Sequence, residues 1–509
     1  RLVGSEMCIR DSNTALTLSS LTLGDGSSTN LTFNTDYAGP IISVTGNISI
    51  SQGAEITLSS TGRNELTLGA DGSYTLMHAD GTIDLGGSDR LAILLDPSSS
   101  AFKKFENNAY LVMENGNLVL VATASKDNKY ARIADTVNSR AGAELLWNLP
   151  GDLAADSILK KVDDAVGALT SSNPSEAKRV MAAVAGSTVN ALGTAQKDAL
   201  RDQMGWIRNR TTLMGVNPAY INEDLPYFHM WMEGTGSYSK LDTKGDESGY
   251  ELTTWGGTVG MDVDINDNFT AGAAFTANYG SLTANAADTA DGDLDSYYVN
   301  LFARYQSRKW SHLLILTGGW NDAKLTRTVD YGSGSYQAHG STTGSGFGAM
   351  YELAYDIALN EDKSVILQPL FNASIVTTRM DGYSESGSAG NAGLRVEDQE
   401  LTTAAVAVGA RLSGLMGSNV FGREALGEIR VNVSQDMGDR RGQANVGFLA
   451  DPSYTRPVYG AKVGSTAFQA GVGLSVPVGT QGVIFVDGNA DIRSGSSSIN
   501  GSIGYRYNF

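Results

Sequence analysis

The chain ends in Ile499-Asn500-Gly501-Ser502-Ile503-Gly504-Tyr505-Arg506-Tyr507-Asn508-Phe509, and this stretch decides the fold. Every second residue is apolar or glycine and the residues between are small or polar, which is the period of a strand with one apolar face. A soluble sheet seldom leaves such an edge free, because the edge would pair with other chains. A closed membrane barrel needs such a strand, with apolar residues toward lipid, polar residues toward the lumen and aromatic residues at the interface.

The composition sets limits on the class of protein. At 509 residues the chain has room for two or three domains. No window approaches about 18 consecutive apolar residues, which excludes a transmembrane helix but not a barrel, whose strands alternate. The net charge of −18 argues against a nucleic-acid partner. The single cysteine, Cys8, excludes a disulfide framework and any site built on several cysteines.

The first twelve residues read differently from the rest. Residues 1–12 lack a starting methionine and resemble a translated sequencing adapter fused to an open-ended gene fragment. We therefore leave them out of the fold prediction and expect the true N-terminus, with any signal peptide, to be missing.

Residues 13–125 consist of short alternating runs separated by Gly, Ser, Asn and Asp. The runs extend from Leu16/Leu18 to Ile83/Leu85 and recur roughly every 8–10 residues. This spacing favours a short parallel β-helix, although a β-sandwich would give a similar pattern. At roughly 20 residues a coil, the segment predicts about five coils.

Residues 126–220 change to helical periodicity. One helix is expected from 153 to 169, followed by a break at 171–173. A second helix starts with Asn173 as N-cap, Pro174 in the first turn and Glu176 three residues after the cap. It extends past Arg210, with Gly186, Gly193 and Gly205 as positions that could interrupt it, and Gly215 and Pro218 close it. Its slim Ala/Gly/Ser/Thr middle favours a helix threaded through a polar lumen, with an ordinary surface helix as the alternative.

Residues 221–509 predict a transmembrane antiparallel barrel. Twelve strands are expected at 226–240, 251–265, 268–281, 293–306, 309–323, 344–358, 363–379, 400–416, 420–436, 460–477, 481–493 and 497–509. Connections after even-numbered strands are short. Those after odd-numbered strands are mostly long, namely 241–250, 282–292, 324–343, 380–399 and 437–459. Short turns at one end and long loops at the other are typical of outer-membrane barrels, and strand 497–509 should close against strand 226–240.

At this point the chain resembles the classical (type Va) autotransporters of Gram-negative bacteria. The resemblance rests on the order of a β-helix, a helical linker and a twelve-stranded barrel, and on Ser502-x-Gly504-x-x-Tyr507-x-Phe509, which matches the family's barrel assembly signal. It implies 13–125 as the end of the passenger, 126–220 as the helical linker and pore helix, and 221–509 as the outer-membrane β-barrel.

The resemblance also implies a function in type V secretion. The barrel would insert among outer-membrane lipids with the help of periplasmic chaperones and the barrel assembly machinery, and would export and display its passenger at the cell surface. Some members cut the linker between two adjacent asparagines. Here the helix has Val189-Asn190-Ala191 with a single asparagine, so Asn190 and Ala191 depart from the pattern and we expect the passenger to stay attached.

The pore helix carries Arg201, Arg208 and Arg210, which could pair with carboxylates of the lumen. The acceptors suggested by strand alternation include Glu233, Glu352 and Glu428, and full solvation of the arginines is the alternative.

The sequence contains no recognisable catalytic or metal motif. None of the four histidines lies in an HExxH pattern, and no Gly-x-Ser-x-Gly elbow occurs. Asp242, Asp246 and Glu247 could bind Ca²⁺, although a solvated acidic loop is the simpler interpretation. We expect no enzymatic activity, no cofactor and an adhesive or structural passenger whose ligand is open. The alternatives are a porin-like outer-membrane channel and a soluble all-β adhesin.

Overall fold

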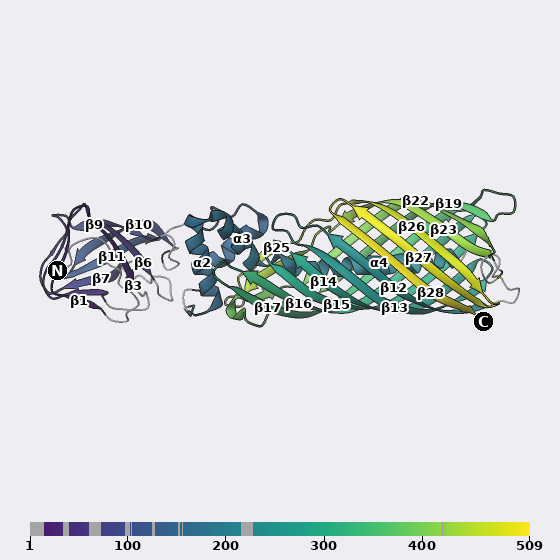
Figure 1. Ribbon diagram of the computed structural model, residues 1–509, viewed down its shortest axis with the longest axis horizontal. Coiled ribbons are helices and arrows are strands. Elements are labelled where there is room, and N and C mark those ends of the chain that lie inside the picture. Colours follow the sequence, from purple (N-terminus) through teal and green to yellow (C-terminus); the bar gives the residue numbers. More distant parts are fainter. Residues whose placement is uncertain are drawn as a thin grey trace.

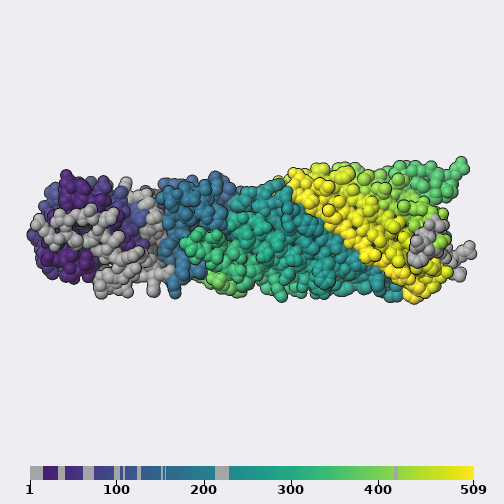
Figure 2. Space-filling model, in the orientation of Figure 1, coloured from purple at the N-terminus to yellow at the C-terminus, as the bar shows by residue number. Residues whose placement is uncertain are grey.

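The computed structural model describes residues 15–33, 40–60, 73–96, 102, 104–124, 128–150, 153–154, 156–214, 227–418, 422 and 424–509. The proposed adapter at 1–12 lies outside these residues. Figure 1 shows an elongated molecule with an N-terminal β-structure, a group of helices and a long barrel, whose far end carries the C-terminus. Figure 2 shows that the terminal strand, in yellow, runs obliquely across the barrel surface.

The N-terminal β-structure contains the expected parallel β-helix. Each coil contributes one strand to each of three parallel stacks. The stacks are β1 (Leu16–Leu18), β4 (Ile42–Val44) and β7 (Ser73–Ala79); β2 (Leu21–Leu23), β5 (Ile48–Ile50) and β8 (Ile83–Asp84); and β3 (Ser28–Phe33), β6 (Glu55–Ser60) and β9 (Arg90–Leu95). Alternate Leu and Ile side chains from these strands fill the interior, where Ile50, Leu58 and Leu76 are fully buried.

The expectation of about five coils is wrong, because the described residues make three. Leu16 pairs with Ile42 and Ile42 pairs with Met77, so each coil is longer than the assumed 20 residues. The last part of the segment is an antiparallel hairpin, β10 (Phe105–Glu114) and β11 (Asn117–Ala124), which pairs with β9 and β7. This hairpin covers the end of the β-helix that faces the helices (Figure 1).

The linker forms α1 (Val137–Trp147), α2 (Ile158–Ser172), α3 (Pro174–Ala185), η2 (Ser187–Val189) and α4 (Asn190–Met214). The Asn173 cap is confirmed, since its side chain accepts a hydrogen bond from the Glu176 backbone N–H. The long helix breaks only at Gly186, where φ is +73°, and α4 continues through Gly193 and Gly205. Among the described residues, no helix is both long and apolar enough to cross a membrane.

The C-terminal region is a closed twelve-stranded antiparallel barrel, as the sequence predicts. Its strands are β12 (Tyr227–Leu241), β13 (Gly249–Asn266), β14 (Phe269–Asn285), β15 (Thr289–Ser307), β16 (Trp310–Asp330), β17 (Ser335–Tyr355), β19 (Val365–Met380), β22 (Gln399–Ser418), β23 (Glu424–Gly438), β26 (Thr466–Val478), β27 (Gly482–Arg493) and β28 (Ser496–Asn508). The two-residue β18 (Ile357–Ala358) continues β17. β12 pairs with both β13 and β28, which closes the barrel at the predicted seam.

Two of the predicted long loops are wrong. Segments 282–292 and 324–343 mostly continue the strands, leaving short turns after Asn285 and Asp330. Segments 380–399 and 437–459 instead fold into a small four-stranded sheet at the same end of the barrel. Its strands are β20 (Tyr383–Ser384), β21 (Leu394–Val396), β24 (Gln443–Phe448) and β25 (Arg456–Tyr459).

The outer surface of the barrel carries an apolar band between two aromatic belts. One belt includes Tyr297 stacked on Trp320, with ring centroids 5.9 Å apart. The other lies near the C-terminus and includes Phe228 against Phe509, at 5.5 Å. Large apolar side chains such as Val408 are exposed between the belts, which is the surface pattern of a barrel solvated by lipid.

Candidate functional site: the barrel lumen and its helix

α4 lies inside the barrel and two of its three arginines bind acidic groups that the sequence reasoning did not name. Arg201 contacts Asp436 on β23 at 2.9 Å, and Arg210 donates to Asp262 on β13 at 2.6 Å. The predicted acceptor Glu352 does face Arg208, at 3.9 Å. The missed carboxylates lie on lumen-facing positions of their strands, so the alternation that selected Glu352 could have found them.

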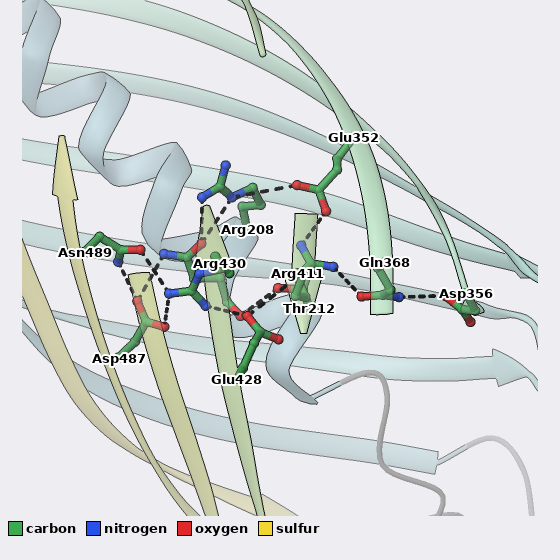
Figure 3. A network of polar contacts seen from close by, with 11 residues as sticks. Arg208, Thr212, Glu352, Asp356, Gln368, Arg411, Glu428, Arg430, Asp487 and Asn489 are labelled. Carbon is green, nitrogen blue, oxygen red and sulfur yellow. Dashed lines mark hydrogen bonds and ion pairs between the residues drawn. The ribbon is translucent and has the colours of Figure 1, made fainter. Parts of the chain in front are cut away.

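The charged side chains of the barrel wall form a network beside α4, shown in Figure 3. Arg411 donates to Glu352 at 2.6 Å and to Gln368 at 2.9 Å. Arg430 donates to Glu428 at 2.6 Å and also to Asp487. Hence Glu428 forms ion pairs with arginines of the barrel wall and not with an arginine of α4. Pairing offsets part of the desolvation cost of these buried charges, so the network adds little net stability, whereas removal of one partner would leave a buried charge uncompensated.

Neutral side chains add hydrogen bonds between α4 and the wall. Gln196 donates to Asn321 at 2.6 Å, Gln203 donates to Thr276 at 2.9 Å, and Asn209 donates to Asp487 at 3.1 Å. None of these residues was predicted from the sequence. Gln196 and Gln203, seven residues apart, share one side of the helix, whereas Asn209 lies on another.

The side of α4 that carries Gln196 and Gln203 also carries apolar residues, whereas the sequence predicted a helix threaded through a polar lumen. Leu200, Met204 and Ile207 recur at helical spacing and pack on buried side chains of β12 and β14–β19. Two glycines of β17 make room for this side. A Cβ at Gly348 would lie 2.6 Å from the Met204 sulfur, and one at Gly346 would lie 2.9 Å from Leu200 Cδ2. The helix is therefore held by apolar packing together with charge pairs, and Arg210 takes part in both, since its guanidinium lies 3.5 Å from the ring of Trp231.

At the end of the barrel opposite the C-terminus, which we call the mouth, the interior is apolar. Helices α1–α3 pack there against the extended strands and the small sheet. The buried side chains from the helices include Leu145, Leu159, Val162, Val180, Met181 and Val184; those from the barrel strands include Leu282, Leu294, Leu325 and Val329, and those from the small sheet include Val446 and Phe448. The linker is thus a folded stopper and not an extended tether.

The acidic segment after β12 anchors the linker. Asp246 accepts hydrogen bonds from the Thr136 hydroxyl at 2.6 Å and from the Ser139 backbone N–H at 3.0 Å, and so caps α1. Buried Asn138 donates to the Tyr459 carbonyl and accepts from the Tyr459 N–H. Glu247 also pairs with an arginine, Arg441, so the prediction of a solvated acidic loop is wrong for Asp246 and Glu247, whereas Asp242 is exposed as predicted. No group of three or more potential metal ligands occurs in the described part of the chain.

Asn190, the residue considered for linker cleavage, is fully buried at the start of α4. Its side-chain amide donates back to the Ser187 carbonyl at 3.2 Å. Its own carbonyl points along the helix and accepts from the Thr194 hydroxyl at 3.1 Å. The amide nitrogen is therefore directed away from the backbone carbonyl that it would attack.

The terminal strand has the orientation that its alternation predicts. Ile499, Ile503, Tyr505, Tyr507 and Phe509 face outward. Of the predicted assembly signal, Tyr507 and Phe509 therefore face outward, whereas the other two members face inward. Ser502 is buried toward the lumen, and Gly504 lies under the ring of Phe485, where a Cβ would approach within 2.2 Å.

Comparison with known proteins assigns this architecture. The family model described as "Autotransporter beta-domain" matches residues 230–489, which is about half of the chain and nearly the whole barrel. The chain belongs to the autotransporter family. As an autotransporter translocator it functions in type V secretion, and its barrel is an outer-membrane barrel. The porin-like channel and the soluble adhesin are set aside.

Curated relatives match this autotransporter over part of their length. The esterase EstA of Pseudomonas aeruginosa is 32% identical over 181 residues, which cover 35% of this chain and 26% of the esterase. An extracellular serine protease of Serratia marcescens is 25% identical over 187 residues, covering 36% of this chain and 17% of the protease. The matched segments thus span about a quarter or less of each relative.

Solved structures give matches of low sequence identity. The translocator domain of the autotransporter NalP from Neisseria meningitidis matches with a TM-score of 0.46 and 16% identity, over 62% of this autotransporter and 99% of that chain. The transport unit of AIDA-I from Escherichia coli matches with a TM-score of 0.38 and 15% identity, over 59% and 97% of the two chains.

Proposed function

We propose that this autotransporter displays its passenger at the cell surface and keeps it attached through a linker that remains threaded in the barrel. The observation that carries the proposal is the continuous path of the chain from the β-helix, through the stopper at the mouth, down the lumen as α4. The first barrel strand, β12, begins near the opening opposite the mouth, and the last strand, β28, ends there. The mouth is therefore the end of the barrel that faces outward.

The geometry at Asn190 supports permanent attachment. Cleavage of an asparagine peptide bond by its own side chain needs the amide nitrogen to reach the backbone carbonyl carbon of the same asparagine, with the amine of the next residue as the leaving group. In α4 the side chain leans toward the helix N-terminus while the carbonyl points toward the C-terminus, as in any regular helix. The bond between Asn190 and Ala191 therefore stays intact in this proposal.

In this proposal the passenger has an adhesive or structural role, and the described residues 15–124 contain no histidine placed as a catalytic base. His78 is the only histidine before His229 in the sequence. Both of its ring nitrogens have partners, since Nδ1 lies 2.8 Å from Asn117 Oδ1 and Nε2 lies 3.3 Å from Asp80 Oδ1. It therefore has no nitrogen free to take a proton from a serine, as a catalytic triad requires. The names of the relatives, an esterase and a serine protease, supply the competing proposal of an enzymatic passenger.

Treatment of intact cells with an external protease tests surface display. Residues 13–125 should be lost while a protected fragment containing α4 and the barrel remains and keeps its heat-modifiable mobility on gels. Cells with a permeabilised outer membrane serve as the control. If the β-helix is digested only after permeabilisation, it lies in the periplasm and the proposal fails.

Mass spectrometry of the culture medium tests attachment. No fragment ending at Asn190 should appear during growth without added protease. Should such a fragment appear and then vanish in Asn190→Gln, self-cleavage at this asparagine would replace permanent attachment.

The barrel assembly machinery and periplasmic chaperones are proposed as partners, and outer-membrane lipid as the surroundings of the apolar band. Phe509 tests the first of these. Its ring packs on Phe228, across the seam, and on Tyr507, at 5.5 and 4.9 Å. Phe509→Ser should lower the amount of heat-modifiable barrel in the outer membrane several-fold, while Ile499→Ser, a matched outward change at the other end of β28, should lower it less. Equal levels in both variants would count against a terminal signal.

A further inference from the structure

Charged side chains surround the break between α3 and α4, at the edge of the apolar stopper. Arg327 on β16 is fully buried there. Its Nε and Nη2 atoms donate to the two carboxylate oxygens of Glu385, at 2.9 and 2.7 Å. Its Nη1 atom donates to the Ala183 carbonyl at 3.1 Å and lies 3.7 Å from Asp288 Oδ2. One guanidinium thus joins the barrel wall, two outer connections and the linker.

The contact with Ala183 adds a charged donor to the end of the helix. Ala183 is near the end of α3, where its carbonyl already accepts from the Gly186 N–H at 3.1 Å and where the carbonyls carry the negative end of the helix dipole. A permanently charged planar donor such as arginine suits this end, and its fork can bind a carboxylate at the same time. The barrel therefore reinforces the C-terminus of a linker helix with a charged donor, beside the cap that Gly186 provides.

Gly186 allows this contact to form. With φ at +73°, it adopts a conformation that side-chain-bearing residues rarely adopt. A Cβ there would lie 2.7 Å from Leu394 Cδ1 and 3.2 Å from the Arg327 Cζ. The helix break thus fits its surroundings only as glycine.

The residues after Gly186 are held by the barrel as well. The Thr188 hydroxyl donates to Asp288, and Gln399 donates to the Val189 carbonyl at 3.3 Å. The barrel therefore binds the chain on both sides of the helix break, through α3 and through η2.

Burying so many charges contributes little net stability, but it restricts the arrangements in which every charge has a partner. Sliding of the linker by one helical turn would take the Ala183 carbonyl and Thr188 away from Arg327 and Asp288. The apolar stopper is less selective, because apolar contacts are not directional. We propose that Arg327 is a positioning residue that fixes the axial position of the linker and so keeps the lumen closed after export. This inference rests on the proposed function, in which the linker stays threaded.

Ion conductance of the full-length protein in planar lipid bilayers tests this role. Arg327→Ala should fold to a heat-modifiable barrel and spend on the order of tenfold more time conducting than the wild type, since a linker without its anchor can shift. Gly186→Leu should do the same from the linker side. Arg379→Ala is the matched control, because Arg379 pairs with Asp398 on the exposed surface, and it should conduct like the wild type.

The possible outcomes distinguish the positioning role of Arg327 from the threading of the linker through the barrel. If Arg327→Ala and Gly186→Leu both stay as closed as the wild type, Arg327 does not position the linker and the inference is overturned. If Arg327→Ala does not fold, Gly186→Leu decides, because that change leaves the barrel sequence intact. A wild-type protein that conducts continuously would instead overturn the threaded linker itself, and the inference with it.

Discussion

The mouth and the lumen of this barrel are built in opposite ways. Along β16, Leu314 and Trp320 face outward while Thr317 and Asn321 face the lumen. Beyond Trp320, Lys324, Thr326 and Asp330 face outward, whereas Leu325 and Val329 are buried inside. The strand keeps its period of two throughout, but the polar and apolar faces exchange places.

This difference shows that the surroundings, and not the barrel geometry, determine which face is apolar. Between the aromatic belts the outside is solvated by lipid, so polar side chains can point only into the lumen. Beyond Trp320 the outside meets water, and the apolar side chains turn inward to bury the linker helices as in a soluble protein. The mouth and α1–α3 thus form a soluble-type core on top of a membrane-type barrel.

The largest expected effect comes from placing a charge in the mouth. Val184 is fully buried among apolar side chains, so Val184→Asp leaves an unpaired carboxylate there and should cost several kcal/mol, enough to displace the linker. Limited proteolysis should then cut α1–α3 while the barrel stays heat-modifiable. Val184→Ala is the matched control and should cause a much smaller change. A linker that remains protected in Val184→Asp would show that the mouth is not an apolar core.

Removal of a charge from the lumen tests its buried ion pairs. Arg411→Ala leaves Glu352 buried without its partner at 2.6 Å and should lower the unfolding free energy by about 3–5 kcal/mol. The double variant Arg411→Met with Glu352→Gln removes both charges and should recover more than half of the loss, measured as thermal unfolding in detergent. Additive losses in the double variant would mean that the two side chains act independently.

A smaller effect is expected from pH at the mouth. Burial raises the pKa of Asp288 to about 6, against the opposing effects of Arg327 and the Thr188 hydrogen bond, while Glu385 acts in the same direction as burial. Between the ordinary carboxyl range and pH 6 the folded state binds more protons than the unfolded state. Attachment of the linker should therefore weaken as pH rises through this window and level off above it.

Asp288→Asn removes the titrating group, so this slope should flatten in the variant. The measurement is the rate of linker proteolysis between pH 4 and pH 8, corrected for protease activity on a pH-insensitive reference peptide. An unchanged slope in Asp288→Asn would assign the pH dependence to another group.

The smallest effect on stability is expected from an exposed ion pair on the outer surface. Lys240 pairs with Glu251 at 2.9 Å, and both side chains are close to half exposed, so solvent screens their attraction. Lys240→Ala should leave thermal unfolding and linker protection unchanged within error. A clear loss of stability would show that surface pairs matter as much as the buried pairs of the lumen.

The comparison also explains what the sequence could predict. Alternation identified all twelve strands and the β12–β28 seam, because it depends only on the period. It failed at 282–292 and 324–343, where the exchange of polar and apolar faces beyond the lipid band resembled loop sequence. The Asn173 cap could be predicted, because helix capping depends only on residues close together in the sequence.

Partners across the lumen were harder to predict. Alternation places Asp436 and Asp262 toward the lumen, but their pairing with Arg201 and Arg210 depends on the register between distant strands and on the rotation of α4, neither of which a single sequence specifies. The same is true of Asp246, which caps a helix that begins over a hundred positions earlier in the chain. The role of Gly346 and Gly348 could not be predicted either, because only the structure shows that these glycines of β17 make room for Leu200 and Met204 of the pore helix.

The two aromatic belts have a consequence for the membrane. In a closed antiparallel barrel each strand is hydrogen-bonded to both neighbours, so no single strand can tilt or slide to adjust its apolar length, as an isolated transmembrane helix can. The distance between the Tyr297–Trp320 stack and the Phe228–Phe509 pair is therefore fixed by the fold. Any mismatch in hydrophobic thickness must be taken up by the lipids, which thin or thicken around the protein.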